Sequence, residues 1–205
     1  MRIGVLALQG ASQEHLLCLS RLGIQGISVK APQHLEGVDA LIIPGGESTT
    51  ISMLLESSGV AEPLAERLAR GMPAFGTCAG MILLAHEVID GRADQLRFDA
   101  VDISVRRNGF GRQVASFEAD LSSHSLGGEP IEAVFIRAPL VERVGDEVEV
   151  LASVEMADGH PAPAMCRQGN VLVTAFHPEL SRDDRVHRLF LEMVEHSLAS
   201  TQKGA

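Results

Sequence analysis

Strand-like and helix-like segments alternate through the first half of this chain, and that alternation is the feature that most restricts its fold. Short apolar runs are followed by stretches whose apolar residues recur at helical spacing. The expected strands are 2–8, 26–29, 38–43 and 72–75, and the expected helices are 13–22, 49–56, 61–69 and 81–85. This order predicts an α/β fold, a three-layer sandwich of the flavodoxin-like type with a mostly parallel central sheet and helices on both faces.

The second half of the chain is richer in strands. Further strands are expected at 99–105, 113–117, 133–136, 148–154, 164–167 and 171–175. A closing amphipathic helix is expected at 183–198. No stretch with the composition of a linker separates the two halves, so the sequence predicts a single domain over residues 1–205.

Charge and cysteine content exclude several classes of protein. Asp and Glu number 27 against 17 Lys and Arg, and no basic run alternates with aromatic residues, so nucleic acid is not an expected partner. The apolar N-terminal stretch is too short for a secretion signal or a membrane span, so a cytoplasmic protein without membrane contact is expected. The three cysteines form no CxxC pair, which argues against a disulfide framework and a zinc site.

Cys78 lies where the expected strand 72–75 gives way to the expected helix 81–85. Gly76 and Gly80 flank it, and small neighbours of this kind permit the strained turn of a nucleophile elbow, in which the sulfur would be exposed. The start of a helix favours a thiolate, and the N–H of Ala79 would point at the same place. The alternative is that Cys78 is a small buried apolar residue, and this motif alone leaves the two readings balanced.

His177, Pro178 and Glu179 follow the last expected strand. Of the eight histidines, only His177 has an acidic residue two positions on, held by a proline at a strand end. The imidazole could act as general base, and the carboxylate could hold it in one tautomer. An ordinary polar turn is the alternative for so short a motif. Combined with Cys78, however, the motif predicts a Cys-His-Glu triad at the carboxyl edge of the sheet.

With these motifs the chain resembles the class I glutamine amidotransferases, which carry Gly-x-Cys-x-Gly and His-x-Glu. Four further motifs make it similar to the glutaminase subunits of pyridoxal 5'-phosphate synthases, and the resemblance runs from Arg2 to about Val194. These motifs are Leu8-Gln9-Gly10 with Glu14-His15, Pro44-Gly45-Gly46-Glu47-Ser48-Thr49-Thr50, Arg107-Asn108-Gly109-Phe110-Gly111-Arg112, and Phe135-Ile136-Arg137-Ala138-Pro139. Gly109 departs from the Ser expected in many relatives, and the segment 157–163 is longer than usual.

The resemblance implies a function and a set of site residues. It implies a glutaminase with the triad Cys78, His177 and Glu179, no cofactor and no metal. Glutamine contacts are implied at Gly46, Glu47, Ser48, Arg107, Ile136 and Arg137, and oxyanion-hole donors at Gly46 and Ala79. The implied partner is a barrel-shaped synthase subunit that combines the ammonia with ribose 5-phosphate and glyceraldehyde 3-phosphate to make pyridoxal 5'-phosphate.

The residues leave other functions open. The elbow and His-x-Glu also occur in glutaminases that serve histidine or nucleotide synthesis. A catalytically silent binding subunit and a Cys-dependent stress hydrolase with a related sheet are alternatives from other classes. The isolated chain is expected to be a poor glutaminase. Partner contact, expected at Gln9 and Glu14-His15 near the end of the first strand, would activate it through a flip of the Gly45–Gly46 peptide.

Overall fold

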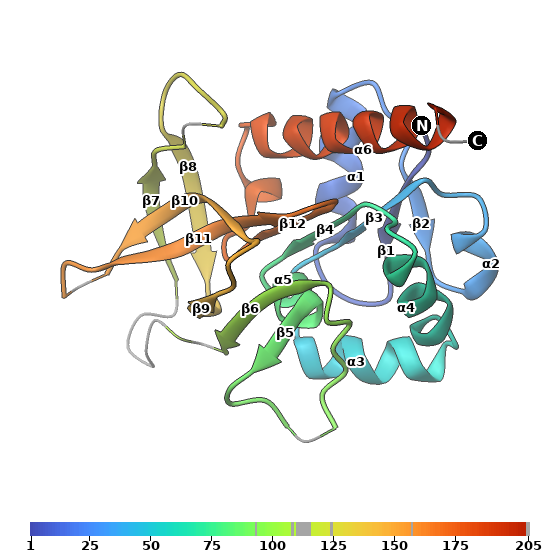
Figure 1. Cartoon of the computed structure of the whole chain (residues 1–205), viewed down its shortest axis with the longest axis horizontal. Helices are drawn as coiled ribbons and strands as arrows, with labels where there is room; N and C mark the ends of the chain where they lie inside the picture. Colours follow the sequence, from blue (N-terminus) through green and yellow to red (C-terminus); the bar gives the residue numbers. More distant parts are fainter. Residues whose placement is uncertain (93, 108, 110–115, 124, 157, 204–205) are drawn as a thin grey trace.

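The computed structural model describes residues 1–92, 94–107, 109, 116–123, 125–156 and 158–203. Within these residues a seven-stranded sheet forms the centre of the molecule (Figure 1). Its parallel part has the order β2-β1-β3-β4-β12, the flavodoxin-like order, and β11 and β10 extend it with antiparallel pairings. The strands are β1 (Ile3–Leu6), β2 (Ile27–Val29), β3 (Ala40–Ile43), β4 (Ala74–Thr77), β10 (Glu149–Glu155), β11 (Pro161–Gln168) and β12 (Val171–Thr174).

Helices cover both faces of this sheet, which confirms the predicted three-layer α/β fold. Helices α1 (Ser12–Arg21) and α6 (Arg185–Lys203) lie on one face, and α3 (Ser48–Ser57) and α4 (Ala61–Ala69) lie on the other (Figure 1). All four residues of each of β1, β3, β4 and β12 are buried. Strands buried on both faces need continuous apolar sequence, which explains why these segments show no alternation of polar and apolar residues.

Two smaller sheets stand beside the central one. One contains β5 (Ala85–Val88), β6 (Val101–Arg106) and β9 (Leu140–Val144), and the other pairs β7 (Ser116–Leu121) with β8 (Ile131–Ile136). In the core between β8 and β12, the rings of Phe135 and Phe176 are 5.7 Å apart, and Phe117 of β7 stacks on Phe135 at 4.5 Å. The prediction that the second half of the chain is rich in strands is therefore confirmed.

Several elements differ from the sequence expectation. The helix predicted at 81–85 is α5 (Ala79–Leu84), which begins two residues earlier. It ends at Leu84 because the chain then turns into β5, which pairs with β6. Strand β9 was missed because it carries Glu142 and Arg143, whose charges pair with Arg106 and Asp102 of β6. The four-residue helix α2 (Pro32–Leu35) is too short to show a periodic pattern. The strand expected at 113–117 corresponds to β7, and residues 113–115 lie outside the described residues.

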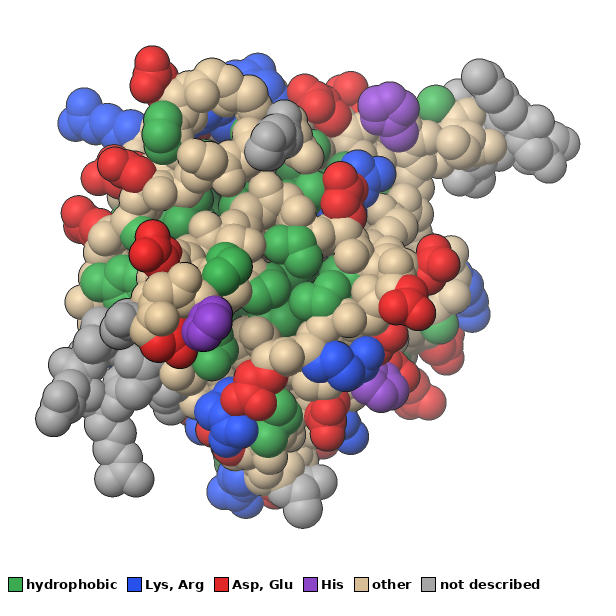
Figure 2. Space-filling model, turned by 60° about the vertical axis from the view of Figure 1, so that its left-hand side comes forward, with side chains coloured by type: hydrophobic (Ala, Val, Ile, Leu, Met, Phe, Trp, Pro, Cys, Tyr) green, Lys and Arg blue, Asp and Glu red, His purple; other side chains and the backbone are tan. Residues whose placement is uncertain are grey.

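The surface is of mixed charge. Figure 2 shows Asp and Glu side chains interspersed with Lys and Arg over one face, around a central group of hydrophobic side chains. Among the described residues, no helix combines the length and the apolar character that crossing a bilayer requires.

The parallel strands direct the loops of the molecule towards one another. Strands β1, β3, β4 and β12 are adjacent and parallel, so the segments that follow their carboxyl ends meet at one edge of the sheet. These segments contain Gln9 and Gly10 after β1, Gly45 and Gly46 after β3, Cys78 after β4, and His177 after β12. The fold thus brings together four of the six motifs that the sequence singled out.

Candidate active site

Cys78 occupies a strained turn between β4 and α5. Its backbone has φ 49° and ψ −101°, in the region that L-residues rarely adopt. A Cβ atom on Gly80 would overlap the carbonyl oxygen of Ile43, and one on Gly76 would overlap the Gly80 backbone, so both neighbours must be glycine. The strand-turn-helix geometry of an elbow is present. The expectation of an exposed sulfur was wrong, because Cys78 is only 6% exposed and lies inside a pocket.

His177 lies beside Cys78 and is held by Glu179. The Nδ1 atom of His177 is 2.7 Å from Oε1 of Glu179, and both residues are buried. A carboxylate can only accept, so Nδ1 donates this bond, and Nε2 is left free to interact with the Cys78 thiol. Pro178 begins the 3-10 helix η1 (Pro178–Leu180), whose tight turn places the His177 and Glu179 side chains together.

The surroundings of His177 favour its protonated form. Burial alone lowers the pKa of this imidazole, but the hydrogen bonds to Cys78 and Glu179 and the charge of Glu179 outweigh it and raise the pKa to about 10. A protonated imidazole between a sulfur and a carboxylate is suited to stabilising a thiolate and to returning a proton later. The three residues therefore have the chemistry of a nucleophile, a base and an orienting acid.

The Gly45–Gly46 segment lies opposite Cys78. The carbonyl of Gly45 accepts from the Ala11 N–H at 3.0 Å, and the Gly45 N–H donates to Oγ1 of Thr77 at 2.9 Å. Within the described part of the chain, the N–H groups of Gly46 and Ala79 donate to no other residue. Neither N–H is taken up by another hydrogen bond there, and their role as oxyanion donors stays a prediction.

We expect Gly10→Ala to disturb this segment. Gly10 has φ +99°, and a Cβ there would overlap the Gly45 carbonyl oxygen. We expect the free energy of unfolding to fall by about 1–3 kcal/mol. We expect glutamine turnover to fall on the order of 100-fold as the Gly45–Gly46 segment moves. Urea unfolding and glutamate release measure the two effects.

Gly23→Ala is the matched control for this substitution. Gly23 also has a positive φ, +77°, but no atom lies within 4 Å of an added Cβ. Gly23→Ala should lower the free energy of unfolding through the cost of a positive φ at alanine, without loss of turnover. Parent turnover in Gly10→Ala would contradict the close approach of Gly10 and Gly45.

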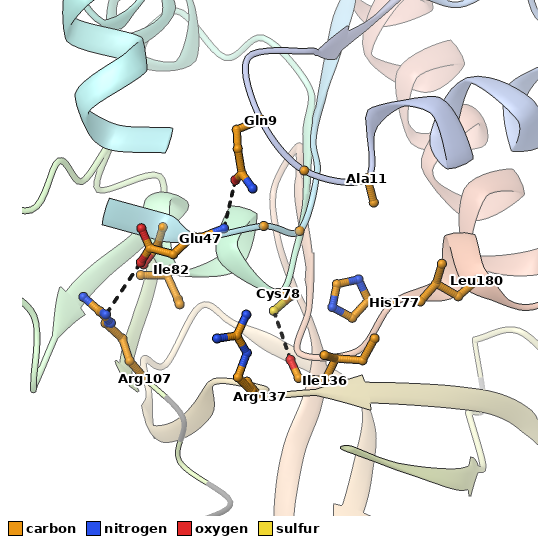
Figure 3. A pocket seen from close by; sticks show the side chains of 14 residues that line it. Gln9, Ala11, Glu47, Cys78, Ile82, Arg107, Ile136, Arg137, His177 and Leu180 are labelled. Carbon is orange, nitrogen blue, oxygen red and sulfur yellow. Dashed lines mark hydrogen bonds and ion pairs between the residues drawn. The ribbon is translucent and has the colours of Figure 1, made fainter. Parts of the chain in front are cut away.

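A pocket of about 360 Å³ opens over Cys78 and His177 (Figure 3). Every residue predicted to contact glutamine lines it, which places these residues in one cavity without showing that they bind glutamine. The residues in the lining are Gln9, Gly10, Ala11, Gly45, Gly46, Glu47, Ser48, Cys78, Ile82, Arg107, Ile136, Arg137, His177 and Leu180.

The charged side chains of the pocket have defined partners. The Glu47 carboxylate caps α3 by accepting from the N–H groups of Thr49 at 3.2 Å and Thr50 at 2.6 Å. Burial would raise its pKa, but these bonds and those to the threonine side chains lower it. Arg107 lies 3.8 Å from Glu47 and donates to Oγ1 of Thr49 at 3.2 Å. Figure 3 shows the Arg137 side chain pointing into the cavity.

Two backbone features complete the pocket wall. The Cys78 sulfur lies 3.8 Å from the carbonyl oxygen of Ile136. Arg137 has φ 44°, a strained conformation at the point where the chain leaves β8. Of the predicted motif 107–112, Arg107 and Gly109 are described, and residues 108 and 110–112 lie outside the described residues.

Sequence reasoning missed His15. It was grouped with histidines that lack an acidic partner and was placed near a partner surface, but it is fully buried and lies 3.5 Å from Glu179. The signal was present in its spacing, because His15, Cys18, Leu19 and Leu22 recur at the interval of one helix face. Gln9, which was expected to contact a partner, lines the pocket, and its Oε1 accepts from the Glu47 N–H at 2.9 Å.

A cluster of Cys18, Asp184 and His187 lies outside the lining of the pocket, next to His15. Their ligand atoms lie within 4.8 Å of one another, close enough for a metal site. Arg21, however, donates to Asp184 at 2.5 Å and to Cys18 at 3.2 Å. Burial raises the pKa of the Cys18 thiol to about 11. The guanidinium already supplies the positive charge, so the cluster is an ion pair with a neutral thiol.

Comparison with known proteins shows similarity over most of the chain. A model of the SNO glutamine amidotransferase family matches residues 5–196. The pyridoxal 5'-phosphate synthase subunit PdxT of Rhodococcus opacus is 53% identical over 194 residues, which are 94% of this chain and 96% of that protein. The subunit of the same name from Mycobacteroides abscessus is 55% identical over 192 residues, with 94% and 96% covered. A crystal structure of a glutamine amidotransferase covers 94% of this chain and 98% of its own, at 47% identity and a TM-score of 0.86.

Proposed function

The chain belongs to the SNO glutamine amidotransferase family, and on that premise we propose that it hydrolyses L-glutamine to L-glutamate and ammonia with Cys78, His177 and Glu179. The ammonia is passed to a synthase that makes pyridoxal 5'-phosphate. The observation that carries the proposal is the placement of Cys78 and His177 in the wall of one pocket, with Nδ1 of His177 held by Glu179 at 2.7 Å. The proposal treats residues 1–205 as one glutaminase domain, of which residues 5–196 match the family model. The cytoplasmic location stays a prediction.

The reaction runs through a thioester. The Cys78 thiolate attacks the side-chain amide carbon of glutamine, and the carbonyl electrons move to oxygen, where the N–H groups of Gly46 and Ala79 stabilise the charge. The tetrahedral intermediate collapses as His177 gives its proton to the leaving nitrogen, which departs as ammonia. Water then attacks the thioester with His177 as base, and glutamate and the free thiol are released. Glu179 keeps the imidazole in place.

The charges of the pocket suit the α-carbon end of glutamine. Arg107 and Arg137 are candidate partners for its carboxylate, because guanidinium groups bind carboxylates with two parallel hydrogen bonds. The ionised Glu47 is a candidate partner for its ammonium, although its two oxygens also cap α3. Gly46, Ser48 and Ile136 contribute backbone groups and walls to the same cavity.

The partner is a separate synthase subunit. Relatives that are more than half identical are named as subunits of pyridoxal 5'-phosphate synthase, and our proposal extends that assembly to this chain. The partner would be the barrel-shaped subunit that consumes ammonia with ribose 5-phosphate and glyceraldehyde 3-phosphate. Docking near Gln9 and Gly10 would reach the pocket directly, because both residues line it. His15 is buried beneath this surface and would not touch the partner.

The Gly45–Gly46 peptide is the proposed point of control. In a trans peptide the C=O and N–H groups point in opposite directions, so the bond between the Ala11 N–H and the Gly45 carbonyl also sets where the Gly46 N–H points. Partner contact that breaks this bond would allow the peptide to flip at low steric cost. Activation would then be a shift between two states of the oxyanion hole.

We expect the isolated chain to be a poor glutaminase and the synthase subunit to activate it. One missing oxyanion donor lowers turnover about 10²- to 10³-fold, so activation of that order is expected. Glutamate release is measured with the chain alone and with the partner added. Cys78→Ala in the same complex is the control for glutaminase activity from the partner.

Gly46→Ala tests the proposed control point. A Cβ on Gly46 would overlap the Oε1 atom of Gln9, which itself holds the Glu47 N–H. We expect this variant to bind the partner but to respond weakly to it. Full activity of the isolated chain, unchanged by the partner, would refute the control by peptide flip and leave the triad standing.

A further inference from the structure

Two buried histidines lie directly beneath the proposed triad. His15 of α1 and His187 of α6 are both fully buried, and Nδ1 of His15 is 2.9 Å from Nε2 of His187. The other nitrogen of His15, Nε2, lies 3.5 Å from Oε2 of Glu179 and 3.2 Å from Oγ1 of Thr77. His15 therefore contacts the oxygen of Glu179 that His177 does not use.

The tautomer of this pair follows from counting unpaired atoms. Oε2 of Glu179 and Nδ1 of His187 have no hydrogen-bond partner among the described residues, and Nε2 of His15 lies 3.5 Å from that carboxylate oxygen. If His15 carries its proton on Nε2, this N–H is shared between Thr77 and Glu179, and the hydroxyl proton of Thr77 and the lone pair of His187 Nδ1 stay unpaired among the described residues, but the charged carboxylate gains a donor. The opposite arrangement leaves a buried carboxylate oxygen and a buried N–H both unpaired, which costs more free energy. His15 is therefore an Nε2–H donor, and His187 donates to its Nδ1.

Both imidazoles are suited to this neutral arrangement. Burial lowers the pKa of His15 well below its usual value, and the neighbouring His187 and His177 lower it further. Burial also lowers the pKa of His187 to about 4, with Asp184 opposing and Arg21 adding to the effect. A neutral His15 supplies one N–H without placing a second positive charge beside His177.

Thr77 also connects the Nε2–H of His15 to the Gly45–Gly46 segment, which is proposed to form part of the oxyanion hole. Oγ1 of Thr77 accepts from the Gly45 N–H at 2.9 Å and has a second lone pair for His15. One imidazole thus contacts the acid of the triad and the threonine that holds the Gly45 segment. Neither His15 nor His187 lines the pocket, so neither contacts a bound glutamine.

We infer that His15 is a positioning residue of the proposed glutaminase. Its Nε2–H, held in that tautomer by His187, anchors Oε2 of Glu179 and links it through Thr77 to the Gly45 segment. Anchoring both carboxylate oxygens stops rotation of the carboxylate, so Oε1 stays aligned with His177 while charge develops on the imidazole. This inference rests on the proposed function, because it assigns a role within the same reaction.

The test compares His15→Gln with His15→Asn in the complex of this chain with its synthase subunit. A glutamine amide can place its N–H₂ near the position of the imidazole Nε2, whereas an asparagine amide reaches only the position of Nδ1. We expect His15→Asn to lower kcat on the order of 10- to 100-fold with the KM for glutamine within twofold. We expect His15→Gln to retain kcat within about threefold. Both variants place an amide of similar polarity in the core, so a difference in kcat between them reports the position of the N–H group rather than a loss of packing.

Phe190→Leu is the control for loss of core packing. Phe190 lies next to Phe75 on the same side of the sheet, with ring centres 5.5 Å apart. Phe190→Leu should lower the unfolding temperature without changing kcat.

If His15→Asn does not fold, His187→Gln and His187→Leu decide the question, because only the glutamine keeps a donor for Nδ1 of His15. The leucine variant should then show the lower kcat.

Three outcomes would count against these proposals, two against the role of His15 and one against the proposed function. If the parent complex hydrolyses glutamine and folded His15→Asn, or His187→Leu in its place, keeps kcat within twofold, His15 has no positioning role. Equal losses in His15→Gln and His15→Asn would also overturn it, because the position of the N–H would not matter. If the parent complex hydrolyses no glutamine, the proposed function itself fails.

Discussion

Replacing Cys78 with alanine should lower glutamine hydrolysis by about 10⁶-fold, to the background rate, because the reaction loses its nucleophile. The alanine fits the site, since it is smaller than cysteine and leaves in place Gly76 and Gly80, which admit the turn. The fold should therefore survive. Glutamate release in the complex with the synthase subunit measures the effect, and partner binding shows that the variant is intact.

Cys166→Ala is the matched control for this substitution. Cys166 lies in β11, fully buried, and burial raises the pKa of its thiol to about 12. Cys18 is likewise protonated at neutral pH. A glutamine-mimicking alkylator should therefore label Cys78 and neither of the other cysteines. Equal labelling of Cys166 would refute the assignment of Cys78 as the nucleophile.

His177→Asn should lower turnover about as far as loss of the nucleophile, about 10⁶-fold, whereas Glu179→Gln should lower it about 10⁴-fold. The ranking has a physical reason. His177 transfers protons in both halves of the reaction, whereas Glu179 orients the imidazole and stabilises its charge through the 2.7 Å bond to Nδ1. An amide at position 179 can still contact the imidazole but carries no charge.

Single-turnover and steady-state measurements on the two variants test this ranking. Ser181→Ala is a control in the same segment, because among the described residues the Ser181 hydroxyl bonds only to the Pro178 carbonyl and the Asp183 N–H, at the end of η1. It should keep parent turnover. If Glu179→Gln were as active as the parent, the triad would reduce to a dyad and the anchoring of Glu179 by His15 would lose its purpose.

Local sequence carried the information on the fold class and on the two catalytic motifs. Apolar runs mark the strands of the parallel sheet because these strands are buried on both faces. Gly76 and Gly80 mark the turn at Cys78 because no other residue fits against the Gly80 and Ile43 backbone. The His177-Pro178-Glu179 motif acts over two positions, so its geometry is nearly complete in the sequence.

Elements that depend on partners distant in the chain were harder to predict. Strand β9 has charged residues that look like a surface loop until β6 is placed beside it. The exposure of Cys78 was also misjudged. An elbow raises a side chain from its own turn, but the loops of neighbouring strands decide whether it meets water or the floor of a pocket.

The sequence by itself determined the sheet, the elbow and the pairing of His177 with Glu179, because each follows from residues a few positions apart and from the backbone geometry they permit. Only the tertiary structure decided the support of that site. His15 and His187 are 172 positions apart, Thr77 lies 32 from Gly45, and Gln9 lies 38 from Glu47. A hydrogen bond depends on distance and direction in space, and a local pattern contains neither for residues on different strands and helices.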